Sequence, residues 1–138
     1  MSQPVDQSGP VETMLASDAA TRMFGIELLE YGEGWARAQL SVRDDMVNGH
    51  GICHGGIIFS LADTAFAYAC NSWGPVTVAA GADIAFIAPA RPGDTLVAEA
   101  RMRADYGRNG IYDVTVTRGE DLIAEFRGRS HTLGDRRP

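Results

Sequence analysis

The most constraining feature of this chain is an apolar segment near its middle. Residues 55–71, GGIIFSLADTAFAYACN, hold a single charged side chain, Asp63, among apolar and small residues. On a helix these side chains would occupy most of the circumference, and such a helix is stable only when other elements surround it. The apolar run, residues 57–70, is shorter than the roughly 20 residues that a membrane-spanning helix needs. The segment therefore predicts a helix buried inside a soluble domain.

Alternation of apolar and polar residues predicts strands on both sides of this helix. Residues 26–42 read as a hairpin that turns at YGEG, residues 31–34, and residues 76–87 read as a strand that ends at the prolines of APARPGD. Half-polar strands over 95–104, 111–117 and 122–130 complete an antiparallel sheet with one covered face. The residues expected on that face are Ala36, Ala38, Leu40, Leu96, Ala98, Ala100, Met102, Ala104, Tyr112, Val114, Val116, Leu122, Ala124 and Phe126.

We expect a single domain with a short tail at each end. With 138 residues the chain is long enough for one core and too short for two. Residues 1–10, MSQPVDQSGP, are polar, and we expect them to be disordered. Helix-like spacing over 11–24 predicts one or two short helices that end near Gly25, with Ser17 and Asp18 able to cap the second. We therefore place one domain at 11–133 and a flexible tail at 134–138.

The order of these elements predicts an α+β fold. A strand pair, a buried helix and then three or four antiparallel strands is the arrangement of the hotdog fold, in which a curved sheet wraps a long central helix. A helix that is apolar on most sides is fully covered only if a second subunit places its sheet alongside. We therefore predict a dimer at minimum.

Charge and cysteine content exclude several partners. The chain has 18 acidic and 12 basic residues, a formal net charge of -6, which disfavours binding to nucleic acid or to an anionic membrane. The two cysteines do not form a disulfide framework, and no N-terminal stretch has the layout of a secretory signal. We expect a cytoplasmic protein.

One stretch resembles a known family of enzymes. Residues 46–72, MVNGHGICHGGIIFSLADTAFAYACNS, are similar to the central segment of hotdog-fold acyl-coenzyme A (acyl-CoA) thioesterases, in particular those of phenylacetate degradation. A weaker likeness extends over about 19–131 and includes the F-x-x-P-x-x-x-G-D pattern at 86–94. The resemblance implies hydrolysis of aryl or arylacetyl thioesters such as phenylacetyl-CoA and hydroxyphenylacetyl-CoA. It also implies no metal, no cofactor apart from the CoA of the substrate, active sites at the dimer interface, and a tetramer of two dimers.

Asp63 is the first candidate catalytic residue. Burying a carboxylate in an apolar helix costs several kcal/mol unless it is paired or hydrogen-bonded. The structural alternative is a helix face open to water beside Ser60 and Thr64. In the functional interpretation, the carboxylate attacks the thioester carbonyl or activates a water molecule that does so. The resemblance assigns this aspartate that role.

Gly55 and Gly56 stand where the helix begins. Glycine lets a carbonyl approach the backbone closely, and the unpaired amides at a helix N-terminus stabilise an oxyanion. The alternative is that both glycines only relieve crowding against the sheet. By the resemblance, the Gly55 amide polarises the thioester carbonyl and Gly56 supports the close approach.

The spacing of Gly55 and Asp63 has a consequence for assembly. They are eight residues apart, which on an α-helix is a rise of about 12 Å, whereas nucleophile and oxyanion donor must both lie roughly 3 Å from the reacting atoms. If both are catalytic, the carboxylate comes from the partner subunit.

Asn48 and His54 complete the predicted catalytic set. The Asn48 amide could hold the attacking water or orient Asp63, although Asn-Gly is also a favoured turn. His54 could orient the thioester, or it could simply cap the helix or brace the loop. In similar thioesterases both positions line the site.

The remaining substrate contacts are less specific. We place Thr64, Gly81, Arg108 and Asn109 among the substrate-binding residues; Gly81 occupies a strand position where similar enzymes often carry a hydroxyl residue. Arg91, Arg108, Arg127 and Arg129 are candidates for the CoA phosphates, with YGRNG at 106–110 favoured because it joins two strands. Ile57, Phe59 and Phe66 could line the acyl pocket, and core packing explains them equally well.

Rival uses of the same stretch are disfavoured. His50 and His54 have a zinc-binding spacing only if both lie on one helix, which the surrounding glycines oppose. Cys53 has no associated oxyanion donor, and the chain has no lysine for a Walker loop. A hydratase would need a His and Asp pair in its own motif, which we do not find. The main alternative is a non-catalytic hotdog module that binds acyl-CoA or an acyl carrier, but such a module needs no buried carboxylate.

Overall fold

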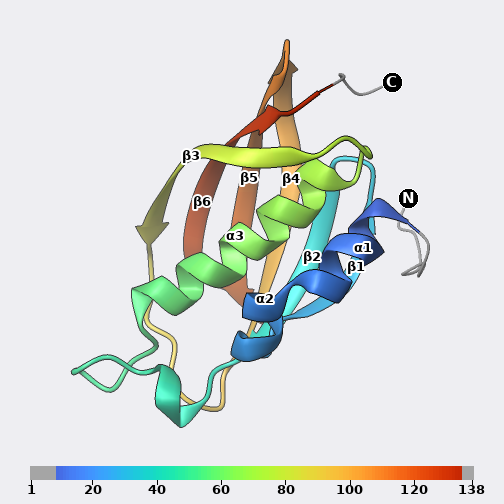
Figure 1. Cartoon of the computed structure of the whole chain (residues 1–138). Coiled ribbons are helices and arrows are strands. Elements are labelled where there is room, and N and C mark those ends of the chain that lie inside the picture. Colours follow the sequence, from blue (N-terminus) through green and yellow to red (C-terminus); the bar gives the residue numbers. More distant parts are fainter. Residues whose placement is uncertain (1–8, 135–138) are drawn as a thin grey trace.

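A curved antiparallel sheet wraps around one long helix (Figure 1). The computed structural model describes residues 9–134. The expected order of strand pair, buried helix and further strands is confirmed. The elements are α1 Pro10–Ser17, α2 Ala19–Phe24, β1 Glu27–Gly32, β2 Trp35–Ser41, the short 3-10 helix η1 Asp44–Met46, α3 Gly55–Asn71, β3 Thr77–Phe86, β4 Thr95–Tyr106, β5 Asn109–Arg118 and β6 Asp121–Thr132.

The sheet has the strand order β1-β2-β4-β5-β6-β3. All neighbouring pairs are antiparallel, so β1 and β3 are its two edges. After α3 the chain reaches the far edge of the sheet, where β3 pairs with β6 alone. The edge strand β3 lies alongside α3, and the backbone N–H and C=O groups on its outer side pair with no other strand among the described residues.

Small residues on the inner face of the sheet let α3 lie close to it. Ala36 and Ala38 on β2 and Ala98 and Ala100 on β4 are fully buried. Larger side chains of the sheet and of α3 fill the rest of the core. The fully buried larger residues include Leu40, Leu61, Phe66, Tyr68, Leu96, Tyr112, Val114 and Val116.

Two of the inward positions predicted from alternation are wrong. Leu122 is 37% exposed, and its neighbour Ile123 is fully buried instead. The register of β5 against β6 shifts at this point, where Thr117 pairs with Leu122 but Val116 pairs with Ala124. A similar irregularity between Met102 and Ala104 accompanies the exposure of Ala104. A β-bulge changes which residues face inward, and strict alternation does not contain it.

The N-terminal helices pack beside α3, as the spacing over 11–24 predicted. The Asp18 carboxylate caps α2 by accepting from the Thr21 N–H at 3.1 Å, and its other oxygen accepts from the Tyr68 hydroxyl at 2.9 Å. At the other end of α2, Arg43 donates to the Phe24 carbonyl at 3.1 Å. Helix α2 is thus fixed to α3 at one end and to the η1 segment at the other.

The predicted boundaries of the domain, at residues 11 and 133, stay predictions. Helix α1 begins at Pro10, the last residue of the expected tail, while residues 1–8 and 135–138 lie outside the described part of the chain. No helix within residues 9–134 is long and apolar enough to cross a membrane.

Candidate functional site

The loop before α3 is folded back on itself and delivers Gly55 to a defined place. The His54 N–H donates to the Met46 carbonyl at 2.8 Å, the Asn48 N–H donates to the Ile52 carbonyl at 2.8 Å, and Val47 forms a bridge with Cys53. The loop turns at Gly51, whose φ of 79° favours glycine. These backbone bonds fix where the helix begins.

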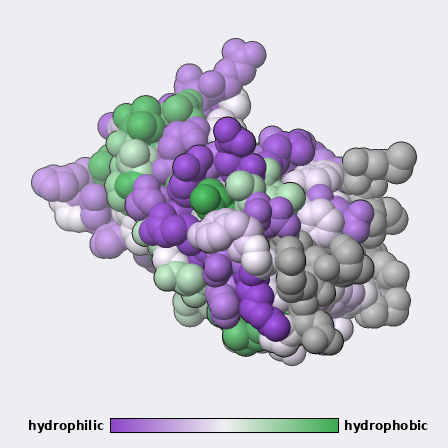
Figure 2. Space-filling model, turned by 90° about the horizontal axis from the view of Figure 1, so that it is seen from above, coloured by the Kyte–Doolittle hydropathy of each residue, from purple (hydrophilic) through white to green (hydrophobic). Residues whose placement is uncertain are grey.

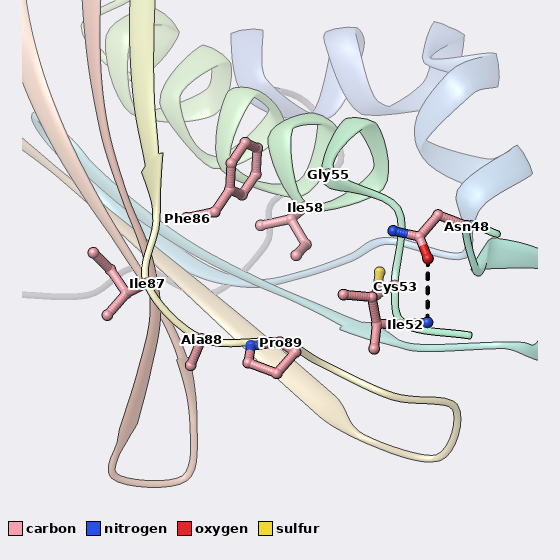
Figure 3. Close-up of a pocket in the computed structure, with 9 residues that line it drawn as sticks. All are labelled: Asn48, Ile52, Cys53, Gly55, Ile58, Phe86, Ile87, Ala88 and Pro89. Carbon is pink, nitrogen blue, oxygen red and sulfur yellow. Dashed lines mark hydrogen bonds between the residues drawn. The ribbon is translucent and has the colours of Figure 1, made fainter. Parts of the chain in front are cut away.

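The Asn48 side chain braces this loop and keeps one donor free. Its Oδ1 accepts from the N–H groups of His50 at 2.8 Å and Ile52 at 3.4 Å. Because two backbone N–H groups donate to this atom, it is the amide oxygen, and the other terminal atom of the side chain is the amide nitrogen, Nδ2. Nδ2 donates no hydrogen bond to any residue within 9–134, and Figure 3 draws it toward the side of the loop where Ile58 lies.

His54 caps α3. Its Nδ1 accepts from the Gly56 N–H at 3.0 Å, so the Gly56 amide is occupied and Nδ1 carries no proton. Together with Phe24, Met46 and Ile57, His54 lines a cavity that does not include Asn48. The structure therefore shows the capping contact of His54.

The Gly55 amide is an unoccupied donor. Among the described residues no acceptor lies within hydrogen-bonding distance of its N–H, as expected for the first residue of a helix. Gly55 lines a cavity of about 440 Å³ at the start of α3 (Figure 3). The other lining residues are Asn48, Ile52, Cys53, Ile58, Phe86, Ile87, Ala88 and Pro89. The cavity thus combines an apolar wall with free amide donors from Gly55 and Asn48.

Asp63 is a half-buried carboxylate without a partner in the described chain. It lines a second cavity, of about 180 Å³, between α2 and the middle of α3. The neighbouring hydroxyls do not serve it, because Ser60 donates to the Gly56 carbonyl at 2.8 Å and Thr64 donates to the Ser60 carbonyl at 2.7 Å. Burial raises the pKa of Asp63 above its ordinary value. Such a carboxylate is a stronger base than an exposed one.

The structure separates the predicted catalytic residues into three places. Gly55 and Asn48 share the first cavity, Asp63 and Thr64 share the second, and His54 and Gly56 share the third. Along α3, Gly55 and Asp63 are about 12 Å apart. One chain does not bring the amide and the carboxylate together.

The predicted CoA-binding residues lie farther away. Arg108 is in the β4–β5 turn, at the top of Figure 1, whereas α3 begins at the lower left. Its side chain is exposed and forms no ion pair within residues 9–134. Asn109 faces His131, with 3.0 Å between Asn109 Oδ1 and His131 Nδ1. Gly81 lies on β3 beside the guanidinium of Arg129.

Two of the other three candidate arginines are engaged in ion pairs. Arg127 holds Asp113 with two hydrogen bonds, of 2.7 and 3.0 Å, and Arg129 binds Asp83 at 3.0 Å. Arg91 lies near Asp94 and helps to lower the pKa of that carboxyl, whose first cause is the hydrogen bond from the Arg91 backbone. Arg108 and Arg91 are therefore the candidates whose guanidinium groups form no ion pair within residues 9–134.

Two residues suggested for the acyl pocket belong to the core instead. The Phe59 ring stacks edge-on against Phe126 with centroids 5.3 Å apart, and Phe66 packs on Tyr112 and Phe126. The cavity at Gly55 is lined instead by residues that sequence reasoning did not select, above all Phe86 and Ile87. Their only sequence signal is the F-x-x-P pattern at the end of β3.

Arg118 fixes the wall of this cavity that follows β3. Its guanidinium donates to the Pro89 carbonyl at 3.2 Å and to Asp94 at 3.0 Å. The Cys53 N–H donates to the Ala90 carbonyl at 2.7 Å, which joins the same segment to the loop before α3. The segment after β3 and the loop before α3, which form two walls of the cavity, are thus hydrogen-bonded to each other, and Arg118 joins them to the sheet.

Cys53 and the possible metal ligands were the rival candidates for chemistry in this stretch. Cys53 lines the cavity, but burial and the nearby Asp94 raise its pKa to about 11, so it is a neutral thiol at physiological pH. No three His, Cys, Asp or Glu residues in the described chain are grouped to hold a metal ion.

The edge strand β3 carries exposed apolar residues. Val78 is 43% exposed and Phe86 is 53% exposed, and Val76 and Ile87 just beyond the strand are exposed as well. From above, most of the surface is hydrophilic, and the most extensive hydrophobic area lies on the left, the side where β3 ends in Figure 1 (Figure 2). An unpaired edge with an apolar border is suited to pairing with another chain.

Comparison with known proteins finds similar chains among thioesterases. The sequence profile of the thioesterase superfamily matches residues 50–125. The acyl-coenzyme A thioesterase PaaI of Escherichia coli is 45% identical over 122 residues, which cover 88% of this chain and 87% of that protein. The structure of the E. coli PaaI protein from the phenylacetic acid degradation operon matches with a TM-score of 0.88 and 43% identity over 91% of each chain. The structure of smu.793 from Streptococcus mutans bound to acetyl-CoA matches with a TM-score of 0.76 and 26% identity, over 81% of this chain and 91% of that one.

Proposed function

The chain belongs to the thioesterase superfamily, and we propose that it hydrolyses aryl and arylacetyl thioesters of coenzyme A, among them phenylacetyl-CoA and hydroxyphenylacetyl-CoA. The observation that carries this proposal is the free Gly55 N–H, which opens into an apolar cavity at the start of α3. The carbonyl oxygen of a thioester placed there accepts this hydrogen bond, which strengthens as the oxygen gains negative charge. The unpartnered carboxylate of Asp63 supplies the base or nucleophile that the same reaction needs.

The active site in this proposal is shared by two subunits. Two chains that pair along their β3 edges would continue the sheet and set their α3 helices antiparallel, with each Asp63 opposite the partner's Gly55. The exposed apolar residues of β3 and the separation of Gly55 from Asp63 within one chain both support this arrangement. A tetramer of two such dimers stays a prediction from the resemblance.

The reaction follows from these groups. In one route the partner's Asp63 takes a proton from a water molecule while the water oxygen attacks the thioester carbonyl. The resulting oxyanion is held by the Gly55 N–H, and the C–S bond then breaks to release the acid and the CoA thiol, which regains a proton. In the other route the Asp63 carboxylate attacks the carbonyl directly, CoA leaves, and water hydrolyses the mixed anhydride. Neither route requires a metal or a further cofactor.

The remaining site residues have supporting roles in this proposal. The free Nδ2 of Asn48 is a second donor beside Gly55 and can hold the attacking water or the carbonyl oxygen. His54 keeps the Gly56 amide capped, whereas the Gly55 amide, which lines the cavity, stays free. Thr64 shares the cavity of Asp63, and Gly81 and Asn109 stay predicted substrate contacts. That Arg108 binds the CoA phosphates is likewise a proposal. A cytoplasmic location for the enzyme is a proposal as well.

The test is release of free CoA from phenylacetyl-CoA and hydroxyphenylacetyl-CoA, with and without a chelator. Asp63→Asn should lower turnover at least about 100-fold, the scale for losing a general base or nucleophile. Asp44→Asn removes the same charge from an exposed position of η1 and serves as the matched control. Binding of these thioesters without turnover by the unaltered protein would favour a non-catalytic module instead.

A further inference from the structure

We propose that the cavity at Gly55 receives the acyl group of the substrate and that Phe86 is the residue that selects aromatic acyl groups. This inference rests on the proposed thioesterase function and specifies which substrates that site prefers. It concerns a side chain that the catalytic steps do not use.

The Phe86 ring lies against the start of α3. A Cβ built on Gly55 would lie 3.0 Å from Phe86 Cζ and 3.3 Å from Cε1, so the ring edge lies directly against the glycine whose N–H is free. Figure 3 shows Phe86 reaching from the end of β3 toward the start of α3. Any group attached to a carbonyl held by the Gly55 amide must therefore pass next to this ring.

The cavity wall is largely apolar. Apart from Asn48, the side chains that line it are apolar or a neutral thiol, and they come from the loop before α3, from α3 itself, from the end of β3 and from the segment after β3. The pantetheine arm of CoA carries amide groups, which lose free energy when they are buried without hydrogen-bond partners. An aryl or arylacetyl group has no such requirement. The cavity is therefore suited to the acyl side of the thioester.

Phe86 lines the cavity instead of packing into the core. It is 53% exposed in the single chain, whereas the aromatic rings of the core, such as Phe66 at 1%, are buried. A ring that lines an apolar cavity contacts a ligand that enters it. If the ligand is itself aromatic, an edge-to-face or offset contact adds a preference of about 3- to 10-fold over a saturated group of the same shape.

The experiment compares two thioesters that differ only in aromaticity, phenylacetyl-CoA and cyclohexylacetyl-CoA. The ratio of their kcat/KM values is measured for the unaltered protein, Phe86→Leu and Phe86→Tyr. Phe86→Leu keeps an apolar side chain without a ring, and its ratio should fall about 3- to 10-fold, while Phe86→Tyr keeps the ring and the ratio. Val78→Ala, on the same edge strand but outside the cavity, controls for effects of β3 and should not change the ratio. Sedimentation of each variant checks that the oligomer is unchanged.

Three results would count against the assignment. If Phe86→Leu lowers kcat/KM equally for both thioesters, the ring contacts a part common to them, such as pantetheine, and the assignment is overturned. An unchanged ratio and unchanged rates in an active Phe86→Leu enzyme would overturn it as well, and would leave the thioesterase function intact. An unaltered protein that hydrolyses neither thioester would overturn the function together with the assignment.

Discussion

The free amide of Gly55 and the half-buried carboxylate of Asp63 lie on the same helix yet open into different cavities. The helix that carries both also keeps them about 12 Å apart, because an α-helix rises by a fixed amount per residue. Chemistry that needs both groups therefore needs two copies of the chain. The exposed apolar edge of β3 offers a surface on which a second copy can pair.

A mixing experiment tests whether the site is shared. Asp63→Asn and Gly55→Val should each abolish most turnover when purified alone. When the two variants are unfolded together and refolded, half of the dimers are mixed, and each mixed dimer holds one site with an intact Gly55 and an intact Asp63. Turnover should then recover to about one quarter of the native value. No recovery, with mixed dimers verified by differently tagged chains, would show that both groups act within one chain.

Asp63 should lower the stability of the folded protein at neutral pH. Burial raises its folded pKa above the unfolded value, so its contribution to stability is fully present below the unfolded pKa, near 3.9, and is lost as pH rises through the folded pKa. Asp63→Asn cannot ionise and should therefore be more stable than the native protein at pH 7. The advantage should shrink toward pH 4. Urea midpoints of both proteins at the two pH values measure this, and equal midpoints at pH 7 would contradict it.

Cys53 should react slowly with alkylating reagents. With its pKa raised to about 11 by burial and by Asp94, the thiolate fraction at pH 8 is small. Alkylation by iodoacetamide at pH 8 should be at least about 100-fold slower than for a free cysteine, and it should accelerate as pH approaches 11. A Cys53→Ser variant gives the background from Cys70, which is also buried. Fast labelling of Cys53 at pH 7 would mean that the thiol is accessible and ionised after all.

Gly128 should not tolerate a side chain. A Cβ at this position would lie 2.7 Å from two ring atoms of Phe66, which is buried against Tyr112 and Phe126. Gly128→Ala should lower the free energy of unfolding by about 1–3 kcal/mol, the range for overpacking a core. Gly49→Ala is the matched control, because no atom lies within 4 Å of its Cβ and its φ is not in the left-handed region. Denaturant unfolding of both variants checks this, and Phe66→Leu should recover part of the loss if the ring is the cause.

The fold was predictable because its determinants are local and periodic. Apolar residues around most of the circumference of 55–71 require a surrounded helix, and period-two alternation marks each strand. The misplacement of Leu122 and Ile123 shows where this reasoning ends. Both residues are apolar, and only the register of β6 against β5 decides which of them faces inward.

Part of the candidate site could be predicted from the sequence, because a helix N-terminus leaves its first amides without partners. Gly55 and Gly56 were selected on this ground, the choice between them came from the family resemblance, and the structure leaves the Gly55 amide free. Phe86 was not identified as part of the site, because a phenylalanine at the end of a strand resembles a core residue. Its place against Gly55 depends on how the edge strand β3 packs beside α3, a long-range relationship that no local pattern encodes.

Gly55→Ala should lower the activity of the protein without lowering its stability. Alanine is favoured over glycine in a helix, so the variant should unfold at the same denaturant concentration as the native protein or at a higher one. Its Cβ, however, would lie 3.0 Å from Phe86 Cζ, which displaces the ring and holds the substrate carbonyl away from the amide. A displacement of about 1 Å can lower kcat/KM for phenylacetyl-CoA about 100-fold. Combining Gly55→Ala with Phe86→Ala should then cost less than the sum of the two single effects, because the clash is gone. Strict additivity in this double-mutant cycle would mean that the ring and the glycine act independently.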